Sequence, residues 1–164
     1  MIAAVTNLDG AITGAHRTWL NPSGRDKAPI GTPRRAMGQL LGNAVRFDVV
    51  DDVLAAGEGI ETMLSLRCVM PKMPMVAALS AAHLAAVLFP PTLRRLYIAR
   101  DDDSAGDSAA ASLTARAHEA GIEAIMLSPR REDFNEDLRL LGLDALRAAV
   151  RVQLAPEDVS RFLI

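Results

Sequence analysis

The sequence is poor in cysteine and has no long apolar run. It contains one cysteine, Cys68, in 164 residues, which excludes an internal disulfide and any cysteine-based zinc knuckle. No apolar stretch approaches the ~20 residues that a membrane-spanning helix requires. The first residues also lack the basic start and the cleavage pattern of a signal peptide. We therefore expect a cytoplasmic protein with no membrane partner.

Aromatic residues are scarce as well. They form 4% of the chain, although 50% of the residues are hydrophobic. The core must therefore consist mainly of alanine, leucine, valine, isoleucine and methionine, a composition that suits helices packed closely on a sheet. A chain of this length is long enough to bury such a core without disulfide or metal crosslinks.

Charge is distributed unevenly along the chain. The formal net charge is −2, but residues 1–47 carry a net charge of +4 and residues 48–164 a net charge of −6. The basic part includes Arg17 and Lys27, which are candidates for binding phosphate or nucleic acid. A basic region beside an acidic one suits a polyanion, and the alternative is a solvated loop with scattered arginines. The sequence favours neither interpretation.

Residues 1–47 form the first of two expected domains, a β-hairpin followed by a basic loop region. The Asp9-Gly10 pair is a strong hairpin signal between two alternating segments. Three prolines then indicate a loop. The expected elements are strands at 2–7 and 12–20, a loop over 21–33 and a short helix at about 34–41.

Residues 48–164 form the second expected domain, in which strands alternate with helices. Ser80 is suited to begin a helix as its N-cap, and Gly121 to end one. Such alternation implies right-handed crossovers and a mostly parallel sheet with helices on both faces, an α/β fold. The expected strands are 53–56, 75–79, 96–99 and 122–127, and the expected helices are 60–69, 80–88, 104–120 and two or three more within 134–162.

Two acidic clusters follow strands of this sheet. Glu58 comes after the first strand, and Asp101-Asp102-Asp103 comes after the third. Because the carboxyl ends of parallel strands lie at one edge, these side chains should meet there. In an extended segment Asp101 and Asp103 point the same way and can hold one ion together. Hard oxygen donors without nearby histidine or usable cysteine favour Mg²⁺ or Mn²⁺.

Helix capping is the alternative explanation for part of the triplet. One of Asp102, Asp103 or Ser104 is expected to cap the helix that follows. Capping needs only one such residue, however, and three consecutive aspartates repel one another. This repulsion favours metal ligation for Asp101 and Asp103.

A third acidic stretch begins at Glu132, after the last strand. Its Asp133 is either an outer metal ligand at the same sheet edge or, like Asn135, a cap of the next helix. Arg100 and Arg130 flank these acidic segments. They are candidates for contacting phosphate, and the alternative is that they neutralise the neighbouring acids.

The order and spacing of these residues resemble the Toprim domain, which bacterial-type primases share with topoisomerases and some nucleases. More narrowly, the chain is similar to the primase type found in phage- and plasmid-associated primases and primase–helicases. There a hairpin with a Gly-x-His-Arg-Thr run often precedes the core. The core match covers about residues 50–140. The matching motifs are Gly57-Glu58-Gly59, Asp101-x-Asp103-x-Ala105-Gly106, Glu132-Asp133-Phe134-Asn135 and, in the hairpin, Gly14-Ala15-His16-Arg17-Thr18.

This resemblance implies nucleotidyl or phosphoryl transfer that depends on Mg²⁺ or Mn²⁺, with nucleotides and a DNA template as partners. Glu58 would be the general acid/base or a metal-facing carboxylate. Asp101 and Asp103 would be metal ligands, and Asp133 an auxiliary one. Two positions depart from the family pattern. Thr62 stands where an acid is common, with Glu61 beside it on a different helical azimuth, and Asn135 stands in place of a second acid.

Two other functions remain open at this point. The same carboxylates suit a Toprim nuclease or nicking domain, and the fold also suits a non-catalytic module that binds DNA or a helicase. One cysteine cannot build the zinc module of complete primases, and the sequence has no helicase P-loop. We therefore expect a fragment, or one component of a larger assembly with a helicase or other replication domains.

Overall fold

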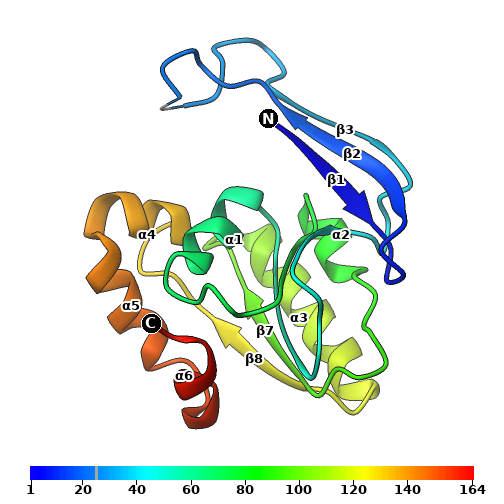
Figure 1. Ribbon diagram of the computed structural model, residues 1–164, viewed down its shortest axis with the longest axis vertical. Coiled ribbons are helices and arrows are strands. Elements are labelled where there is room, and N and C mark those ends of the chain that lie inside the picture. The colour runs from blue at the N-terminus through cyan, green and yellow to red at the C-terminus, as the bar shows by residue number, and fades with distance from the viewer. Residues whose placement is uncertain (25) are drawn as a thin grey trace.

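The computed structural model describes residues 1–24 and 26–164. Arg25, within the expected loop 21–33, lies outside the described residues. Figure 1 shows a three-stranded sheet that stands beside an α/β body. Within the described ranges, no helix combines the length and the apolar character that crossing a membrane requires.

The N-terminal sheet consists of β1 (Ile2–Thr6), β2 (Ile12–Thr18) and β3 (Arg34–Gly38). It is antiparallel, with the strand order β1-β2-β3. The predicted hairpin is confirmed, since β1 and β2 pair in register from Ile2 opposite Arg17 to Val5 opposite Gly14. Gly10 has a φ of 81° in the turn between them, a conformation that glycine adopts without strain.

The helix predicted at about 34–41 is wrong, because this segment forms β3. β3 pairs with β2 from Gly14 opposite Gly38 to Thr18 opposite Arg34. A Cβ on Gly38 would lie 2.4 Å from the carbonyl oxygen of Thr13. The close approach of the two backbones therefore depends on glycine at this position.

The second sheet consists of β4 (Val45–Phe47), β5 (Val53–Gly57), β6 (Met75–Ala77), β7 (Arg95–Ala99) and β8 (Glu123–Leu127). Its strand order is β4-β6-β5-β7-β8. Strands β5 to β8 run parallel, as the alternating pattern predicts. β4, at the edge of the sheet, is antiparallel to β6. β4 thus pairs with this sheet although it precedes residue 48. The domain boundary after residue 47 stays a prediction.

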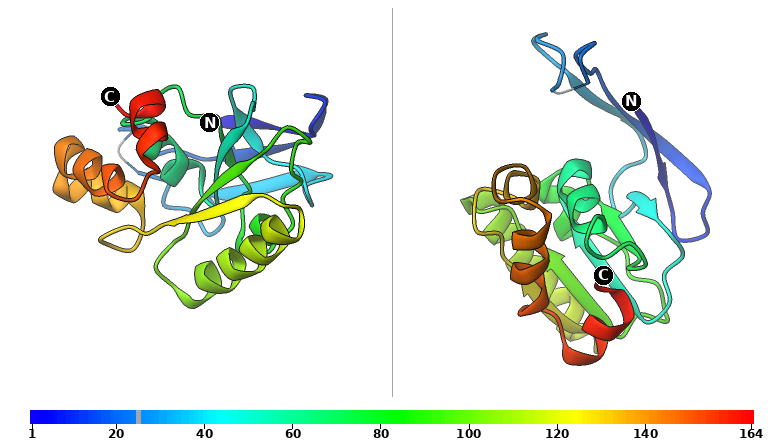
Figure 2. Two further views of the ribbon diagram at one scale, coloured as in Figure 1. Left: turned by 90° about the horizontal axis from the view of Figure 1, so that it is seen from below. Right: turned by 60° about the vertical axis from the view of Figure 1, so that its left-hand side comes forward.

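Helices cover both faces of the five-stranded sheet (Figure 2). Val53 and Ala55 of β5 face the layer that contains α1, α4, α5 and α6, whereas Leu54 and Ala56 face α2 and α3. This alternation along one strand produces two apolar clusters, one on each side. The helices are α1 (Ile60–Arg67), α2 (Ala81–Ala85), α3 (Ser104–Glu119), α4 (Phe134–Leu141), α5 (Leu143–Arg151) and α6 (Pro156–Phe162).

The helix termini follow the sequence signals. The Ser80 side chain accepts a hydrogen bond from the N–H of His83 at 3.2 Å, which confirms the predicted N-cap of α2. α3 ends just before Gly121, which has a φ of 72°. The start of α2 and the end of α3 therefore have the capping residues that the sequence indicated.

Candidate functional site

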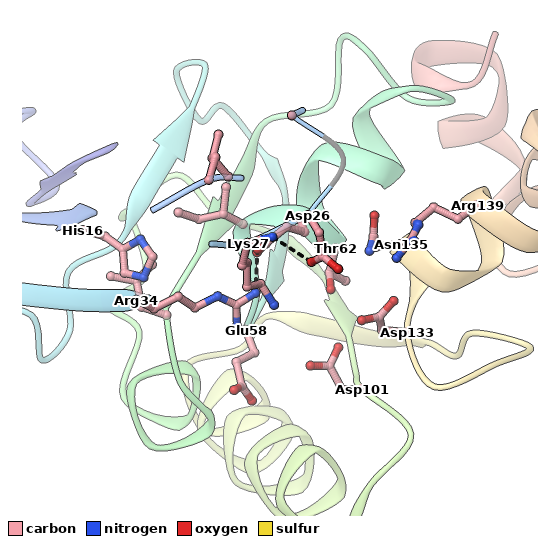
Figure 3. Close-up of a pocket in the computed structure, with 16 residues that line it drawn as sticks. His16, Asp26, Lys27, Arg34, Glu58, Thr62, Asp101, Asp133, Asn135 and Arg139 are labelled. Carbon is pink, nitrogen blue, oxygen red and sulfur yellow. Dashed lines mark hydrogen bonds and ion pairs between the residues drawn. The ribbon is translucent and has the colours of Figure 1, made fainter. Parts of the chain in front are cut away.

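A pocket lies at the point where the order of the parallel strands reverses. From β5 the chain crosses to β6 on one side, and later to β7 on the other side of β5. In open α/β sheets such a point creates a crevice outside the carboxyl ends of the strands. Glu58, Asp101 and Asp133 line the pocket (Figure 3). Three of the predicted carboxylates therefore share one cavity, each after a different parallel strand.

Asp101 lies in an unfavourable electrostatic environment. Its pKa is raised to about 6, mainly by burial and further by the charges of Glu58, Asp133 and Asp103. The charge of Arg34 lowers this pKa, but only in part. Asp101 Oδ1 is buried and has no hydrogen-bond partner among the described residues. A buried carboxylate oxygen without a donor, surrounded by like charges, is stabilised by a cation.

Asp103 and Asp133 are helix N-caps. Asp103 Oδ1 accepts from the N–H of Gly106 at 2.7 Å, and Asp133 Oδ1 accepts from the N–H of Glu136 at 2.6 Å. Asp133 also lines the pocket, whereas Asp103 is exposed and lies outside its lining. Capping therefore occupies one oxygen of each carboxylate. Joint ligation of one ion by Asp101 and Asp103 stays a prediction.

Glu58 is held close to the sheet by the glycine that precedes it. A Cβ on Gly57 would lie 2.5 Å from the sulfur of Met63 and 3.3 Å from the Cβ of Ala99, so the backbone passes closely there. Burial raises the pKa of Glu58, as does the charge of Asp103, and Arg34 opposes this rise. A carboxyl group with a raised pKa is suited to exchange protons with a bound substrate.

The opposite wall of the pocket comes from the N-terminal sheet and the loop that follows β2 (Figure 3). His16, Lys27 and Arg34 line the pocket on this side. Arg34 donates to Glu61 Oε1 at 2.5 Å. Burial raises the pKa of Glu61, but the hydrogen bond from Arg34 and the charge of Lys27 reverse this and lower it overall. Lys27 and Arg34 thus face the carboxylates across the cavity, and Asp26 lies beside Lys27 on the same loop.

Sequence reasoning singled out neither Arg34 nor Arg139, and both line the pocket. The helix predicted at 34–41 gave no reason to place Arg34 near Glu58. Its position follows from the pairing of β3 with β2, where Arg34 lies opposite Thr18. No local pattern in the sequence signals that pairing.

Three other predicted phosphate contacts lie outside the pocket lining. The Arg100 guanidinium pairs with Asp102 at 2.8 Å and with Asp107 at 2.7 Å, so it neutralises acids around α3. Arg130 is exposed in the segment before α4. Arg17 projects from the face of β2 opposite to that of its neighbour His16. Of the four predicted basic contacts, Lys27 alone lines the cavity.

The donors of the pocket fit Mg²⁺ or Mn²⁺ in their chemistry. The carboxylates of Glu58, Asp101 and Asp133 and the side-chain amide of Asn135 supply hard oxygens. Asp101 Oδ1 is the buried acceptor without a donor. Over residues 1–24 and 26–164, no three His, Cys, Asp or Glu side chains are grouped closely enough to hold one ion. The fit therefore rests on Asp101 and the oxygens near it.

Two family models match the chain. The model described as "Toprim domain" matches residues 53–144, more than half of the chain. A second model, described as "Domain of unknown function (DUF7146)", matches residues 1–47. No curated protein matches the chain significantly in sequence.

Solved primase structures share the fold. The primase fragment of the bacteriophage T7 primase–helicase protein has a TM-score of 0.63 at 15% identity, over 93% of this chain and 61% of that one. A DNA primase domain from Pseudomonas aeruginosa has a TM-score of 0.61 at 18% identity, over 93% and 50%. The DnaG catalytic core has a TM-score of 0.62 at 16% identity, over 93% and 52%. The chain thus spans between one half and about three fifths of these structures.

Proposed function

The chain belongs to the Toprim domain family, and from this premise we propose that it performs nucleotidyl transfer on a DNA template with Mg²⁺ or Mn²⁺. It would be the catalytic domain of a cytoplasmic primase-like replication protein. The observation that carries the proposal is the buried Asp101 Oδ1 without a donor, set among Glu58 and Asp133. The fold shared with primase catalytic cores supports the class of reaction.

Each side of the pocket has a role in this proposal. Asp101 and Asp133 would hold the cation, which would supply charge stabilisation for the phosphoryl oxygens. Glu58 has a raised pKa and accepts or donates a proton at the reacting hydroxyl. Lys27 and Arg34 meet the nucleotide phosphates from the opposite wall. Asp103 fixes the start of α3 through its cap and adds negative charge near Asp101.

Further domains complete the proposed protein. The solved T7 relative is a fragment of a primase–helicase, and this chain spans 61% of that fragment. We therefore include a helicase or another replication domain among the proposed partners, together with DNA and nucleotides. The complete assembly is the right material for an activity assay.

Metal binding can be tested on the chain itself. We expect Mg²⁺ or Mn²⁺ to raise the melting temperature of the wild type, because a ligand that binds only the folded state stabilises it by about 2.7 kcal/mol at a hundred times its Kd. Asp101→Asn should abolish this rise. Asp9→Asn, in the exposed hairpin turn, is the matched control and should retain it. An equal rise in Asp101→Asn would contradict the proposed ligand.

The reaction class is tested with the assembled replication protein. We expect labelled ribonucleotides to be incorporated on single-stranded DNA, and Glu58→Gln to abolish incorporation. Glu119→Gln, exposed at the end of α3, is the control. Cleavage of a labelled duplex without incorporation would identify a nuclease. If Glu58→Gln and Asp101→Asn leave metal binding and activity unchanged, the domain is a non-catalytic module.

A further inference from the structure

The N-terminal sheet has two faces of different character. Val5, His16 and Thr18 point to the inner face and are buried against the rest of the molecule. The residues between them point the other way, because side chains alternate along a strand. They form what we call the outer face. Its members, by the register of the three strands, are Ile2, Ala4, Ala15, Arg17, Arg35 and Met37.

The outer face is exposed on its two edge strands and partly apolar, and Ala15 and Arg17 of the central strand are half-buried. Ile2 is 80% exposed and Met37 is 63% exposed, and every residue of β3 is exposed. Figure 2 shows the sheet projecting from the α/β body, with which it is in contact at the end of β1. Ile2 on one edge strand and Met37 on the other thus leave apolar surface uncovered on this face.

Two arginines lie side by side on this face. Arg17 of β2 is directly opposite Arg35 of β3, an arrangement that costs stability because like charges repel across a strand pair. The three strands contain no acidic residue. Among the described residues, Arg34 pairs with Glu61, whereas neither Arg17 nor Arg35 forms an ion pair. An anionic partner would remove the repulsion.

Trp19 extends the outer face beyond the end of β2. It lies two residues after Arg17, whose guanidinium stands 5.3 Å from the centre of the indole ring. The backbone N–H of Trp19 donates to the Pro33 carbonyl at 2.8 Å, and the Trp19 carbonyl accepts from the backbone N–H of Ala28 at 2.8 Å. The backbone is therefore held on both sides, and the residue is still 51% exposed. An exposed indole on a backbone held in this way, beside a guanidinium, is suited to stack a base.

We infer that the outer face binds single-stranded nucleic acid, with a base stacked on Trp19 and phosphates on Arg17 and Arg35. This deepens the proposed function, because it gives the template a holding surface outside the catalytic pocket. Arg34 and Arg35 are neighbours on opposite faces of β3, so the edge of this strand lies between the outer face and the pocket. A second copy of the chain is a poor occupant, because a two-fold contact here would bring the arginine pairs together.

Trp19 is the only tryptophan, so its fluorescence reports on this face alone. The experiment titrates the full chain with an oligo-dT strand in EDTA, which keeps the metal-dependent site out of the measurement. We expect quenching of Trp19 that saturates with the strand, and a rise in the anisotropy of a labelled strand over the same range. No quenching when the strand binds would overturn the inference.

Variants then separate this face from general charge attraction. Trp19→Ala should weaken binding by about fivefold or more, the effect of losing one stacked base. Arg35→Ala should weaken it and lower the slope of log affinity against log salt by about 0.7, the effect of one phosphate contact on a single strand. Arg35 is exposed, so this variant is expected to fold. Arg151→Ala, exposed at the end of α5, is the matched control and should bind like the wild type.

The outcomes also distinguish this inference from the proposed function. Asp101→Asn should quench like the wild type, since its carboxylate lies in the pocket. Strand binding that survives a failure of nucleotide incorporation supports the outer face and counts against the catalysis. If Trp19→Ala and Arg35→Ala both bind within twofold of the wild type, or if Arg151→Ala weakens binding equally, the inference is wrong. Self-association that Trp19→Ala abolishes would assign the face to a second copy.

Discussion

Arg34 of β3 and Glu61 of α1 form an ion pair at 2.5 Å that connects the N-terminal sheet with the pocket of the α/β body. The charge of Arg34 also lowers the pKa of Glu58 and of Asp101. One cation therefore links two parts of the chain and moderates the repulsion among the carboxylates. The ion pair with Glu61 neutralises part of the charge of Arg34. Glu61 stands one position before Thr62, where the family pattern often has an acid.

Replacing Arg34 should raise the pKa values of the carboxyl groups in the pocket. In Arg34→Gln we expect the pKa of Asp101 to rise above about 6, because the opposing positive charge is lost. More of the carboxylate is then protonated near pH 6, and Mg²⁺ affinity should fall there by roughly two- to fivefold. Carboxyl NMR titration in EDTA and calorimetry with Mg²⁺ measure the two effects. Glu61→Gln retains the arginine and should not raise this pKa; an unchanged titration in Arg34→Gln would refute the assigned role.

Asp101 should make the stability of the metal-free protein depend on pH. Its folded-state pKa of about 6 lies above the ordinary 3.8, so the folded chain binds more protons than the unfolded chain between these values. The free energy of unfolding should therefore fall as pH rises from about 4 to about 7, and not change further above that range because of this group. We expect Asp101→Asn to reduce this fall by about 1–2 kcal/mol, allowing for solvent screening.

Urea unfolding at pH 4 and pH 7.5 in EDTA measures this dependence. Asp9→Asn alters an exposed turn and is the control, expected to follow the wild type. If the wild type and Asp101→Asn lose the same free energy between the two pH values, then burial and the neighbouring charges do not raise the pKa of Asp101.

The α/β body was predictable from the sequence because its signals are local. Strand–helix alternation, the Ser80 cap and the glycine that follows α3 all act within a few residues of one another. The meeting of Glu58, Asp101 and Asp133 followed from a topological rule, that parallel strands bring their carboxyl ends to one edge. Local chemistry and this rule were sufficient for the acidic half of the pocket.

The cationic half was not predictable in the same way. β3 pairs with β2 across a loop, and its own residues include no β-branched or aromatic side chain that would mark a strand. Arg34 reaches the pocket only through that pairing. Asp103 shows a second limit. Its capping bond to Gly106 turns it out of the pocket lining, although the i, i+2 spacing alone would place it beside Asp101.

A buried carboxylate attaches α6 to the sheet. Asp158 is fully buried, and its Oδ2 accepts from the Tyr97 hydroxyl at 2.7 Å and from Arg95 at 2.7 Å. Tyr97→Phe should lower the free energy of unfolding by about 1.5–3 kcal/mol, because it removes this bond to a charged group and the bond that the hydroxyl accepts from the Ala155 backbone N–H. Chemical denaturation measures it. Asp144→Asn, whose carboxylate is 95% exposed, should cost only about 0–1 kcal/mol; equal costs would show that the buried bond adds nothing.

Gly106 should prove essential to the position of Asp101. A Cβ at residue 106 would lie 2.4 Å from the carbonyl oxygen of Asp101, and neither backbone can yield easily. We expect Gly106→Ala to displace the segment 101–103, lower the free energy of unfolding by about 1–3 kcal/mol, as overpacking does, and weaken Mg²⁺ binding. Thermal unfolding with and without Mg²⁺ measures both. Gly31→Ala is the control, because a Cβ there meets nothing within 4 Å. If Gly106→Ala binds Mg²⁺ like the wild type, then the close contact between α3 and Asp101 does not position Asp101 as a metal ligand. The glycine at residue 106 is then required for another reason.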